Sequence, residues 1–340
     1  MIKKNINIKE LASALGLSTS TISRAFRDNS DINPDTKEHI LAKAKELGYQ
    51  PNIFASSLRE KAARTIAIVL PELANNFFSQ AVKGIEQITR AHNYHTLVYV
   101  TDSIYEKEVS ILTELQSGRV DGIIMSATGE GKDSAHIVNL VNMSIPVVFF
   151  DRIYEDIDLP KIITNDYQSS FQATKDLIER GCRKIAFLVI DPDRSIGQIR
   201  TKGYKDAIKA AGFKKDEIHV LECDNDREIS YDIIRNFILE TQPDAIVTAV
   251  ERLAVVTYRV CINEHISIPE QLKVIGFSSL EIADLLNPSL STITQPAFEM
   301  GRKAAQQLFV SLKSPKHSPT PEPVVLSSSI IHRKSTQGRG

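Results

Sequence analysis

The 340-residue sequence predicts an all-α helix-turn-helix head joined to a two-lobed α/β body with parallel sheets. Short amphipathic segments, separated by capping residues and glycines, fill residues 1–50. From residue 65 to residue 335, apolar runs alternate with helical stretches, as is typical of parallel strands covered by helices. The alternation occurs as two arrays, before and after about residue 163, and therefore predicts two lobes.

The composition is that of a globular protein, with 42% hydrophobic and 24% charged residues. The sequence has no run of about 18 apolar residues, and its first ten residues lack the apolar segment of a secretory signal, so we expect a cytoplasmic protein. Cys182, Cys223 and Cys261 show no CxxC spacing, which favours reduced structural thiols.

Residues 1–64 contain 11 Lys or Arg against 7 Asp or Glu, and the remainder contains 30 against 35. A basic head favours a polyanionic partner, although a surplus of four charges also arises by chance.

The first and third helices of the head are predicted from their caps. Asn7 is a suitable N-cap and Glu10 completes a capping box, while Gly16 ends the first helix. Asn33 and Pro34 open the third helix, because Asn caps well and Pro fits the first helical position. The apolar positions of the first helix repeat at helical spacing: Ile8, Leu11, Ala12 and Leu15.

The second helix lies in the stretch LGLSTSTISRAF and is predicted to run from its N-cap, Ser18, to about Arg27. A tight turn containing glycine between two short helices is the helix-turn-helix pattern, whose second helix enters the major groove N-terminus first. Thr19 and Ser20 are then placed to bind phosphates or base edges, and Arg24 to reach a guanine or a phosphate. The alternative is a polar turn on an ordinary three-helix bundle. The apolar side of this helix is formed by Ile22, Ala25 and Phe26.

The stretch IKELASALGLSTSTISRAFRDNSDINPDTKEHILAKAKELGYQPNIFASSLR resembles the N-terminus of the LacI/GalR family of bacterial transcription regulators. The resemblance continues through the body in RTIAIVLPELANNFFSQAVKGIE, RVDGIIM, IPVVFFDR, LIERGCRKIAFL, LKVIGFSS and LSTITQPAFEMGRKAA. It implies a periplasmic-binding-protein-like body with three crossovers, near 162–165, 290–294 and 322–328. It also implies a ligand-responsive, sequence-specific DNA-binding regulator, expected to repress carbohydrate-utilisation genes.

The resemblance implies domain boundaries and DNA contacts. We expect the head at 1–50, a hinge at 51–64 and the effector-binding and dimerisation domain at 65–335. Within that domain, the N-lobe is expected at about 65–163 and 293–323, and the C-lobe at about 165–290 and 326–335. The expected DNA-binding residues are Ser18, Thr19, Ser20, Thr21, Ser23, Arg24, Asn52, Ala55 and Leu58.

The hinge is too short to form a stable isolated helix, so its order must come from a partner. In the family, the paired hinge helices lie in the minor groove, where a leucine matching Leu58 opens the central base step. Ala55 would let the two helices approach closely. The alternative is a flexible linker with Leu58 docked on the body.

In open α/β sheets, ligands lie beyond the carboxyl ends of the strands, so two facing sheets form a cleft. The strands are predicted at Thr65–Leu70, Thr96–Val100, Asp121–Met125, Pro146–Phe150, Lys184–Ile190, Ala245–Ala249 and Lys273–Phe277. The resemblance implies the following effector-binding residues in or beside the cleft: Glu72, Phe77, Phe78, Asp151, Arg194, Arg200, Glu251 and Ser278. Core packing is the alternative role for the two phenylalanines.

Arg200 is the strongest of these candidates because it matches the arginine that precedes the family's "xxGY" segment, here RTKGY. Its guanidinium suits vicinal hydroxyls, a carboxylate or a phosphate. Ser278 and Thr164 replace acids that are common in the family, and Val250 replaces a polar residue next to Glu251. We therefore hypothesise an anionic effector, such as a sugar phosphate or an acid sugar. A neutral sugar held by carboxylates at 72, 151 and 251 is the alternative.

Other function classes find little support. The segment SATGEGKDS lacks the first glycine of a P-loop and the Ser or Thr after Lys132, and GxGxxG, HExxH and GxSxG motifs are missing. No enzyme, cofactor or metal is therefore expected. A small-molecule carrier fits poorly with a DNA-binding head, whereas a catabolite-control-type regulator with a protein co-effector stays open. The expected partners are a pseudo-palindromic double-stranded DNA operator, a sugar or sugar phosphate, and a second copy of the chain. The polar tail KSTQGRG has no heptads and so favours a dimer over a tetramer.

Overall fold

The computed structural model describes residues 6–26, 32–49, 63–129, 131–313 and 322–337. It divides into two compact units, Met1–Ala63 and Arg64–Gly340, which we describe separately. No helix in these described ranges is both long and apolar enough to cross a membrane.

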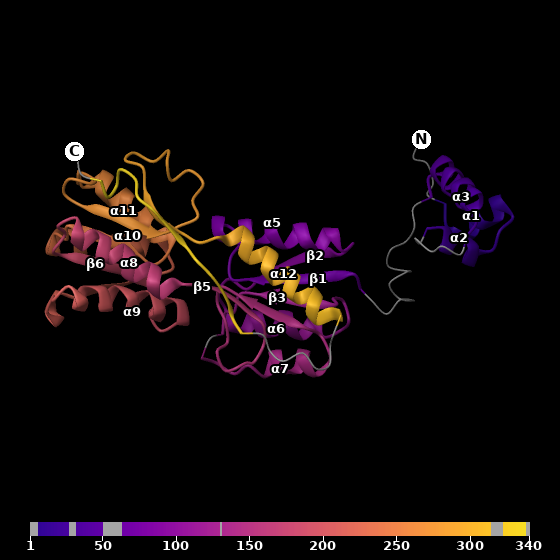
Figure 1. The fold of residues 1–340 in the computed structure, drawn as a ribbon, viewed down its shortest axis with the longest axis horizontal. Helices are drawn as coiled ribbons and strands as arrows, with labels where there is room; N and C mark the ends of the chain where they lie inside the picture. Colours follow the sequence, from indigo (N-terminus) through magenta and orange to yellow (C-terminus); the bar gives the residue numbers. More distant parts are fainter. Residues whose placement is uncertain (1–5, 27–31, 50–62, 130, 314–321, 338–340) are drawn as a thin grey trace. The chain divides into compact units, whose positions relative to one another are not determined.

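The first unit is a bundle of three helices around a small apolar core (Figure 1). Leu11, Ile22 and Ile40, one from each helix, are fully buried in it. The predicted caps are confirmed. The Asn7–Glu10 capping box forms on the first helix, and the Ser18 hydroxyl accepts a hydrogen bond from Thr21 N at 3.1 Å. The helices are α1 (Ile8–Leu15), α2 (Thr19–Ala25) and α3 (Pro34–Leu47), so α2 ends earlier than predicted.

The N-lobe of the second unit is a six-stranded, fully parallel sheet in the order β11-β5-β4-β3-β1-β2. Helices α5 (Asn76–Ala91) and α12 (Ala297–Lys313) cover one face, and α6 (Tyr105–Leu115) and α7 (Ala135–Asn142) cover the other. The strands are β1 (Thr65–Leu70), β2 (His95–Val100), β3 (Gly122–Met125), β4 (Val147–Phe150), β5 (Lys161–Thr164) and β11 (Val324–Leu326).

The C-lobe is a second six-stranded sheet, in the order β12-β10-β9-β8-β6-β7. Helices α8 (Asp166–Glu179) and α9 (Ser195–Ala210) cover one face, and α10 (Arg227–Thr241) and α11 (Glu251–Asn263) cover the other. A short 3-10 helix, η1 (Lys215–Glu217), precedes β7. The strands are β6 (Ile185–Ile190), β7 (His219–Cys223), β8 (Ala245–Thr248), β9 (Lys273–Phe277), β10 (Ser291–Thr294) and β12 (Ser329–Ile331).

The two-lobed α/β class and its three crossovers are confirmed. The chain crosses from β5 to α8, from β10 to α12, and from β11 to β12 (Figure 1). The last crossover takes only two residues, so β11 and β12 continue in nearly one direction. β11 is parallel to its neighbour, whereas β12 is antiparallel to β10. This reversal is expected if the carboxyl ends of the two sheets face each other.

The three crossings are tied to one another by hydrogen bonds. Asn165, on the first crossing, accepts a hydrogen bond from Ser328 N through Oδ1 at 2.8 Å, and its own N–H donates to Leu326 O at 3.2 Å. Gln295 Nε2, on the second crossing, donates to Thr164 Oγ1 at 3.0 Å. The three crossings therefore form one hydrogen-bonded hinge rather than three independent connections.

All seven predicted strands exist, with boundaries that agree within one residue. Five further strands were not predicted as strands: β5, β7, β10, β11 and β12. Four of these, β5, β10, β11 and β12, flank the crossings, and β7 is a partly exposed edge strand without a continuous apolar run.

Candidate effector cleft and DNA-reading helix

Helix α2 presents a polar N-terminal turn to solvent. Ser18 Oγ caps the helix and also lies 2.7 Å from Ser20 Oγ and 2.9 Å from Thr21 Oγ1. Thr19 and Arg24 are exposed, whereas Thr21 and Ser23 are half-buried. The apolar residues Ile22 and Ala25 hold the opposite side of the helix in the core. Thr19, Ser20 and Arg24 are therefore accessible to a nucleic acid, while Ser18 and Thr21 shape the turn. The predicted hinge contacts, Asn52, Ala55 and Leu58, lie outside the described residues.

A cleft opens between the two lobes at the carboxyl ends of both sheets. Its outer part has a cavity volume of about 320 Å³, and an adjoining inner pocket has a volume of about 70 Å³. Seven of the eight predicted effector residues line the inner pocket or both parts: Glu72, Phe77, Phe78, Asp151, Arg200, Glu251 and Ser278. Arg194, the eighth, lines the outer part.

Arg200 is held rigidly at the inner pocket. Its side chain is almost fully buried; Nη1 donates to Ala249 O at 2.6 Å, and Nη2 lies 3.0 Å from Asp166 Oδ2. The guanidinium carbon lies 3.8 Å from the centre of the Phe277 ring, a cation–π contact. Within the described residues, its buried Nε has no hydrogen-bond partner. Because an unmade buried hydrogen bond is costly, this N–H is a candidate donor to a ligand.

Glu251 places a carboxylate beside Ser278. Glu251 Oε2 accepts hydrogen bonds from Ser278 Oγ at 2.8 Å and from Ser279 N at 3.1 Å. Its other oxygen, Oε1, accepts from Asn76 Nδ2, in the opposite lobe, at 2.9 Å. A carboxylate therefore lies beside the end of β9, although it is supplied by the N-terminus of α11.

An ion pair bridges the lobes at the outer part of the cleft. Arg252 Nη2 lies 2.6 Å from Glu72 Oε2, and these side chains are 23% and 31% exposed. Arg252 Nη1 also donates to Asn225 O at 2.8 Å, and Asn75 Nδ2 donates to Glu72 Oε1 at 2.8 Å. We call the Glu72–Arg252 pair the latch, because it connects the loop after β1 to the start of α11.

A second cross-lobe contact involves Arg194, at the N-cap of α9. Its Nε lies 3.1 Å from Asp191 Oδ2 within the C-lobe. Nη1 and Nη2 donate across the cleft to Thr128 O at 3.3 Å and Ser103 O at 3.4 Å. Arg152 Nη1, from the N-lobe, donates to Ser103 Oγ at 3.3 Å, so two guanidinium groups converge on one residue.

The remaining predicted side chains form the pocket wall. Phe77 and Phe78 belong to the N-lobe core, where Phe78 packs edge-on against Phe150 with ring centres 6.2 Å apart. Both rings also line the inner pocket, so core packing and a wall function coexist. Asp151 lies at the end of β4 with a left-handed φ of 62°, and Ser126 Oγ donates to its Oδ2 at 3.4 Å.

The described part of the chain contains no group of three or more His, Cys, Asp or Glu side chains that could hold a metal ion. The three cysteines are free and buried. Burial raises the pKa of the Cys182 thiol to about 11, and that of the Cys223 and Cys261 thiols to about 12.

Several cleft residues were not among the predicted effector contacts. Arg152 and Arg252 each directly follow a predicted acid, and this adjacency at a strand end was an available signal. Asn76 and Gln80 lie one helical turn apart on α5, and Gln80 Nε2 donates across the cleft to Ser279 O at 3.3 Å. No local pattern marks these two residues, because their partners are more than 170 residues away.

Two protein-family models match this chain, one in the body and one in the head. The family model of the periplasmic binding proteins and sugar binding domain of the LacI family matches residues 63–327. The model of the bacterial regulatory proteins of the lacI family matches residues 7–52.

Similar proteins extend over nearly the whole chain. The HTH-type transcriptional regulator RegA of Clostridium saccharobutylicum is 30% identical over 97% of this chain and 99% of its own length. The HTH-type transcriptional repressor PurR of Vibrio atlanticus is 31% identical over 91% of this chain and 93% of its own.

Among solved structures, the lac repressor dimer bound to operator and the anti-inducer ONPF shares the fold, with a TM-score of 0.84, 20% identity and coverage of 98% and 100% of the two chains. A LacI family transcriptional regulator from Enterococcus faecium with bound ribose has a TM-score of 0.72 and 26% identity, over 80% of this chain and 98% of its own. A helix-turn-helix head and a two-lobed body with an interlobe cleft define a DNA-binding transcriptional regulator that carries a sugar-binding type of domain. The chain belongs to the LacI family of bacterial regulatory proteins.

Proposed function

We propose that this regulator is a repressor of carbohydrate-utilisation genes whose effector binds in the interlobe cleft. The observation that carries this proposal is Arg200, a buried guanidinium fixed between Asp166 and Phe277, with its Nε unpartnered within the described residues. Such a preorganised donor loses little entropy on binding hydroxyl or acidic groups of a ligand. The ribose in the Enterococcus faecium structure and the ribose operon repressor of Haemophilus influenzae, 28% identical over 92% of this chain, support a sugar-like effector.

The proposed effector is a sugar that carries an anionic group. In the inner pocket, Glu251 and Asp151 offer acceptors to ring hydroxyls, and Arg200 offers a donor. In the outer part, Arg194 and Arg252 contact the carboxylates of Asp191 and Glu72, whereas the hydrogen bond of Arg152 is to the neutral Ser103 hydroxyl. Arg227 also lines the outer part but is exposed, so the half-buried Arg152 is the arginine best placed to bind a phosphate or a carboxylate of the effector.

Isothermal titration calorimetry with ribose and ribose 5-phosphate, and with glucose and glucose 6-phosphate, tests the effector class. We expect one phosphorylated sugar to bind at least about tenfold more tightly than its neutral parent. One additional charge-assisted hydrogen bond accounts for a difference of this size. Arg152→Gln should remove this preference and leave the affinity for the neutral sugar unchanged. Tight binding of neutral sugars alone would refute the anionic effector.

Two copies of the chain are proposed to act as a homodimer on a pseudo-palindromic operator. Exposed apolar residues of the C-lobe support an interface, since Ile262 on α11 is 67% exposed and Leu285 is 77% exposed. In this mechanism, the effector favours one lobe arrangement and so shifts whether the paired hinges fold around Leu58 in the minor groove. Sedimentation velocity of Leu285→Glu, with Lys209→Glu as a control at a surface position, tests the interface: only the former should yield monomers.

A protein co-effector of the catabolite-control type stays a prediction. The Catabolite control protein A of Priestia megaterium is 26% identical over 89% of this chain. Titration with a phosphorylated phosphocarrier protein, followed by operator binding, separates this mechanism from control by a small molecule.

A further inference from the structure

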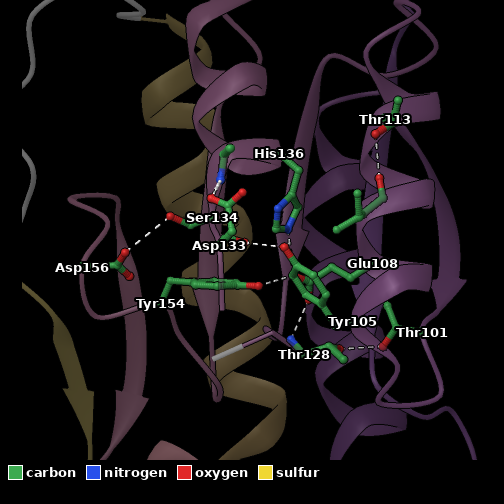
Figure 2. A network of polar contacts seen from close by, with 12 residues as sticks. Thr101, Tyr105, Glu108, Thr113, Thr128, Asp133, Ser134, His136, Tyr154 and Asp156 are labelled. Atoms are coloured by element: carbon green, nitrogen blue, oxygen red, sulfur yellow. Dashed lines mark hydrogen bonds and ion pairs between the residues drawn. The ribbon is translucent and has the colours of Figure 1, made fainter. Parts of the chain in front are cut away.

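A carboxylate is buried inside the N-lobe, away from both parts of the cleft. Glu108, on α6, has no exposed surface. Its Oε2 accepts a hydrogen bond from Thr128 N at 2.6 Å, and its Oε1 accepts from Tyr154 OH at 2.7 Å and from His136 Nε2 at 3.0 Å (Figure 2). These donors come from the loop after β3, the segment after β4 and helix α7. Glu108 therefore joins four segments of the N-lobe at one point.

Burying the Glu108 carboxylate carries a large desolvation free energy. Burying a carboxylate costs more than filling the same space with an apolar side chain, and such groups are most useful when they specify one arrangement. Burial and the adjacent Glu108 carboxylate raise the pKa of the Tyr154 phenol, so the phenol stays protonated and donates. The network is thus fully formed, as a buried polar cluster requires.

One of the segments that Glu108 holds, the loop after β3, contacts the C-lobe. Thr128 donates its N–H to Glu108, places Oγ1 2.7 Å from Thr101 Oγ1, and offers its carbonyl oxygen to Arg194. Ser103, two residues after Thr101, offers the second carbonyl oxygen to Arg194. Of the two acceptors that Arg194 contacts across the cleft, Thr128 belongs to the buried network and Ser103 closely follows Thr101, which is bonded to it.

Close packing leaves this loop little freedom. At Gly129, next to Thr128, a Cβ atom would lie 2.2 Å from Tyr154 Oη and 2.3 Å from the Tyr105 ring. Tyr105 OH in turn donates to Asp133 O at 2.8 Å, further along the loop (Figure 2). The direction of the Thr128 carbonyl is thus set from the side of the buried carboxylate.

We propose that Glu108 is a positioning residue for lobe closure: it orients the Thr128 and Ser103 carbonyl oxygens that Arg194 binds across the cleft. The effector response therefore depends on a carboxylate that does not touch the effector. This inference rests on the proposed function only where it concerns the response, because the lobe contact itself exists without any effector.

The test measures the distance between the lobes in the full-length protein without effector. Ser117→Cys in the N-lobe and Ala210→Cys in the C-lobe are exposed sites for spin labels, and the three native thiols are buried. Pulsed electron paramagnetic resonance then gives the distance distribution. Arg194→Ala should lower the closed population severalfold. Glu108→Gln should also lower the closed population, because the amide NH₂ of the new side chain would face one of the three hydrogen-bond donors. The double variant should have the same closed population as Arg194→Ala alone.

Two further variants separate positioning from stability. Leu112→Ala, on the same helix and equally buried, should lower the melting temperature and leave the distance distribution unchanged. Tyr154→Phe removes a single hydrogen bond and serves if Glu108→Gln does not fold; it should shift the distribution part of the way. The proposal is overturned if the folded Glu108 or Tyr154 variant keeps the wild-type distribution, or if wild type already shows the distribution of Arg194→Ala. A failed effector titration would leave these outcomes unaffected, so the two hypotheses fail separately.

Discussion

Breaking the latch between Glu72 and Arg252 should open the cleft. The two charged atoms lie 2.6 Å apart, and both side chains are less than one-third exposed. At an effective dielectric constant of about 20, this separation gives a gross attraction of about 6 kcal/mol. Desolvation and loss of side-chain entropy offset most of it, and we expect a net coupling of about 1–2 kcal/mol. Neutralising the pair should therefore reduce the ratio of closed to open molecules about 5- to 30-fold.

A double-mutant cycle with Glu72→Gln, Arg252→Gln and the double variant measures this coupling. The spin-label pair that reports lobe distance gives the closed population of each variant. The pair Glu228–Arg259 is a matched control, because it has the same 2.6 Å separation but lies within the C-lobe and is 70% and 49% exposed. Its neutralisation should leave the lobe distance unchanged. Additivity of the two latch substitutions within about 0.3 kcal/mol would contradict the expected coupling between Glu72 and Arg252.

Three further predictions concern the cleft, the head and the cysteines. Arg200→Lys should weaken effector binding at least about tenfold, since one ammonium cannot make the contacts of a planar guanidinium; calorimetry checks this, and wild-type affinity would contradict it. Arg24→Ala should weaken operator binding by about 1–3 kcal/mol and lower its salt dependence, while Asn7→Ala should instead destabilise the head by about 1 kcal/mol; fluorescence anisotropy and thermal melting separate the two effects. The native protein should resist Ellman's reagent at pH 8, because burial raises the pKa of Cys223 to about 12 and keeps its thiol neutral well above that pH; rapid reaction before unfolding would contradict this.

The parts of the fold that depend on local sequence could be predicted. Asn7, Ser18 and Asn33 marked three helix starts, because a cap is decided by the residues within one turn of it. Buried strands such as β1 and β9 were marked by continuous apolar runs. The edge strand β7 was missed because only Cys223 of its residues is buried and its sequence contains His219 and Glu222.

The geometry of the site could be predicted only in part. The resemblance marked which residues follow the strands, but the latch joins residues 180 positions apart and has no local signature. Glu108 did leave a trace, since it shares a buried helix face with Leu112 and Leu115. A charged residue at an apolar position of a helix indicates a buried network, but its partners become visible only when the loops are folded around it.

The hydrogen-bonded hinge at the three crossings determines how the two lobes can move. Hydrogen bonds of Asn165 and Gln295 connect the three crossings to one another. We therefore expect the lobes to move about a single hinge axis. We expect such a joint to favour opening and closing over sliding and twisting. Rearranging side chains in the cleft can thus change which molecule closes the body without changing the direction of the movement that closure produces.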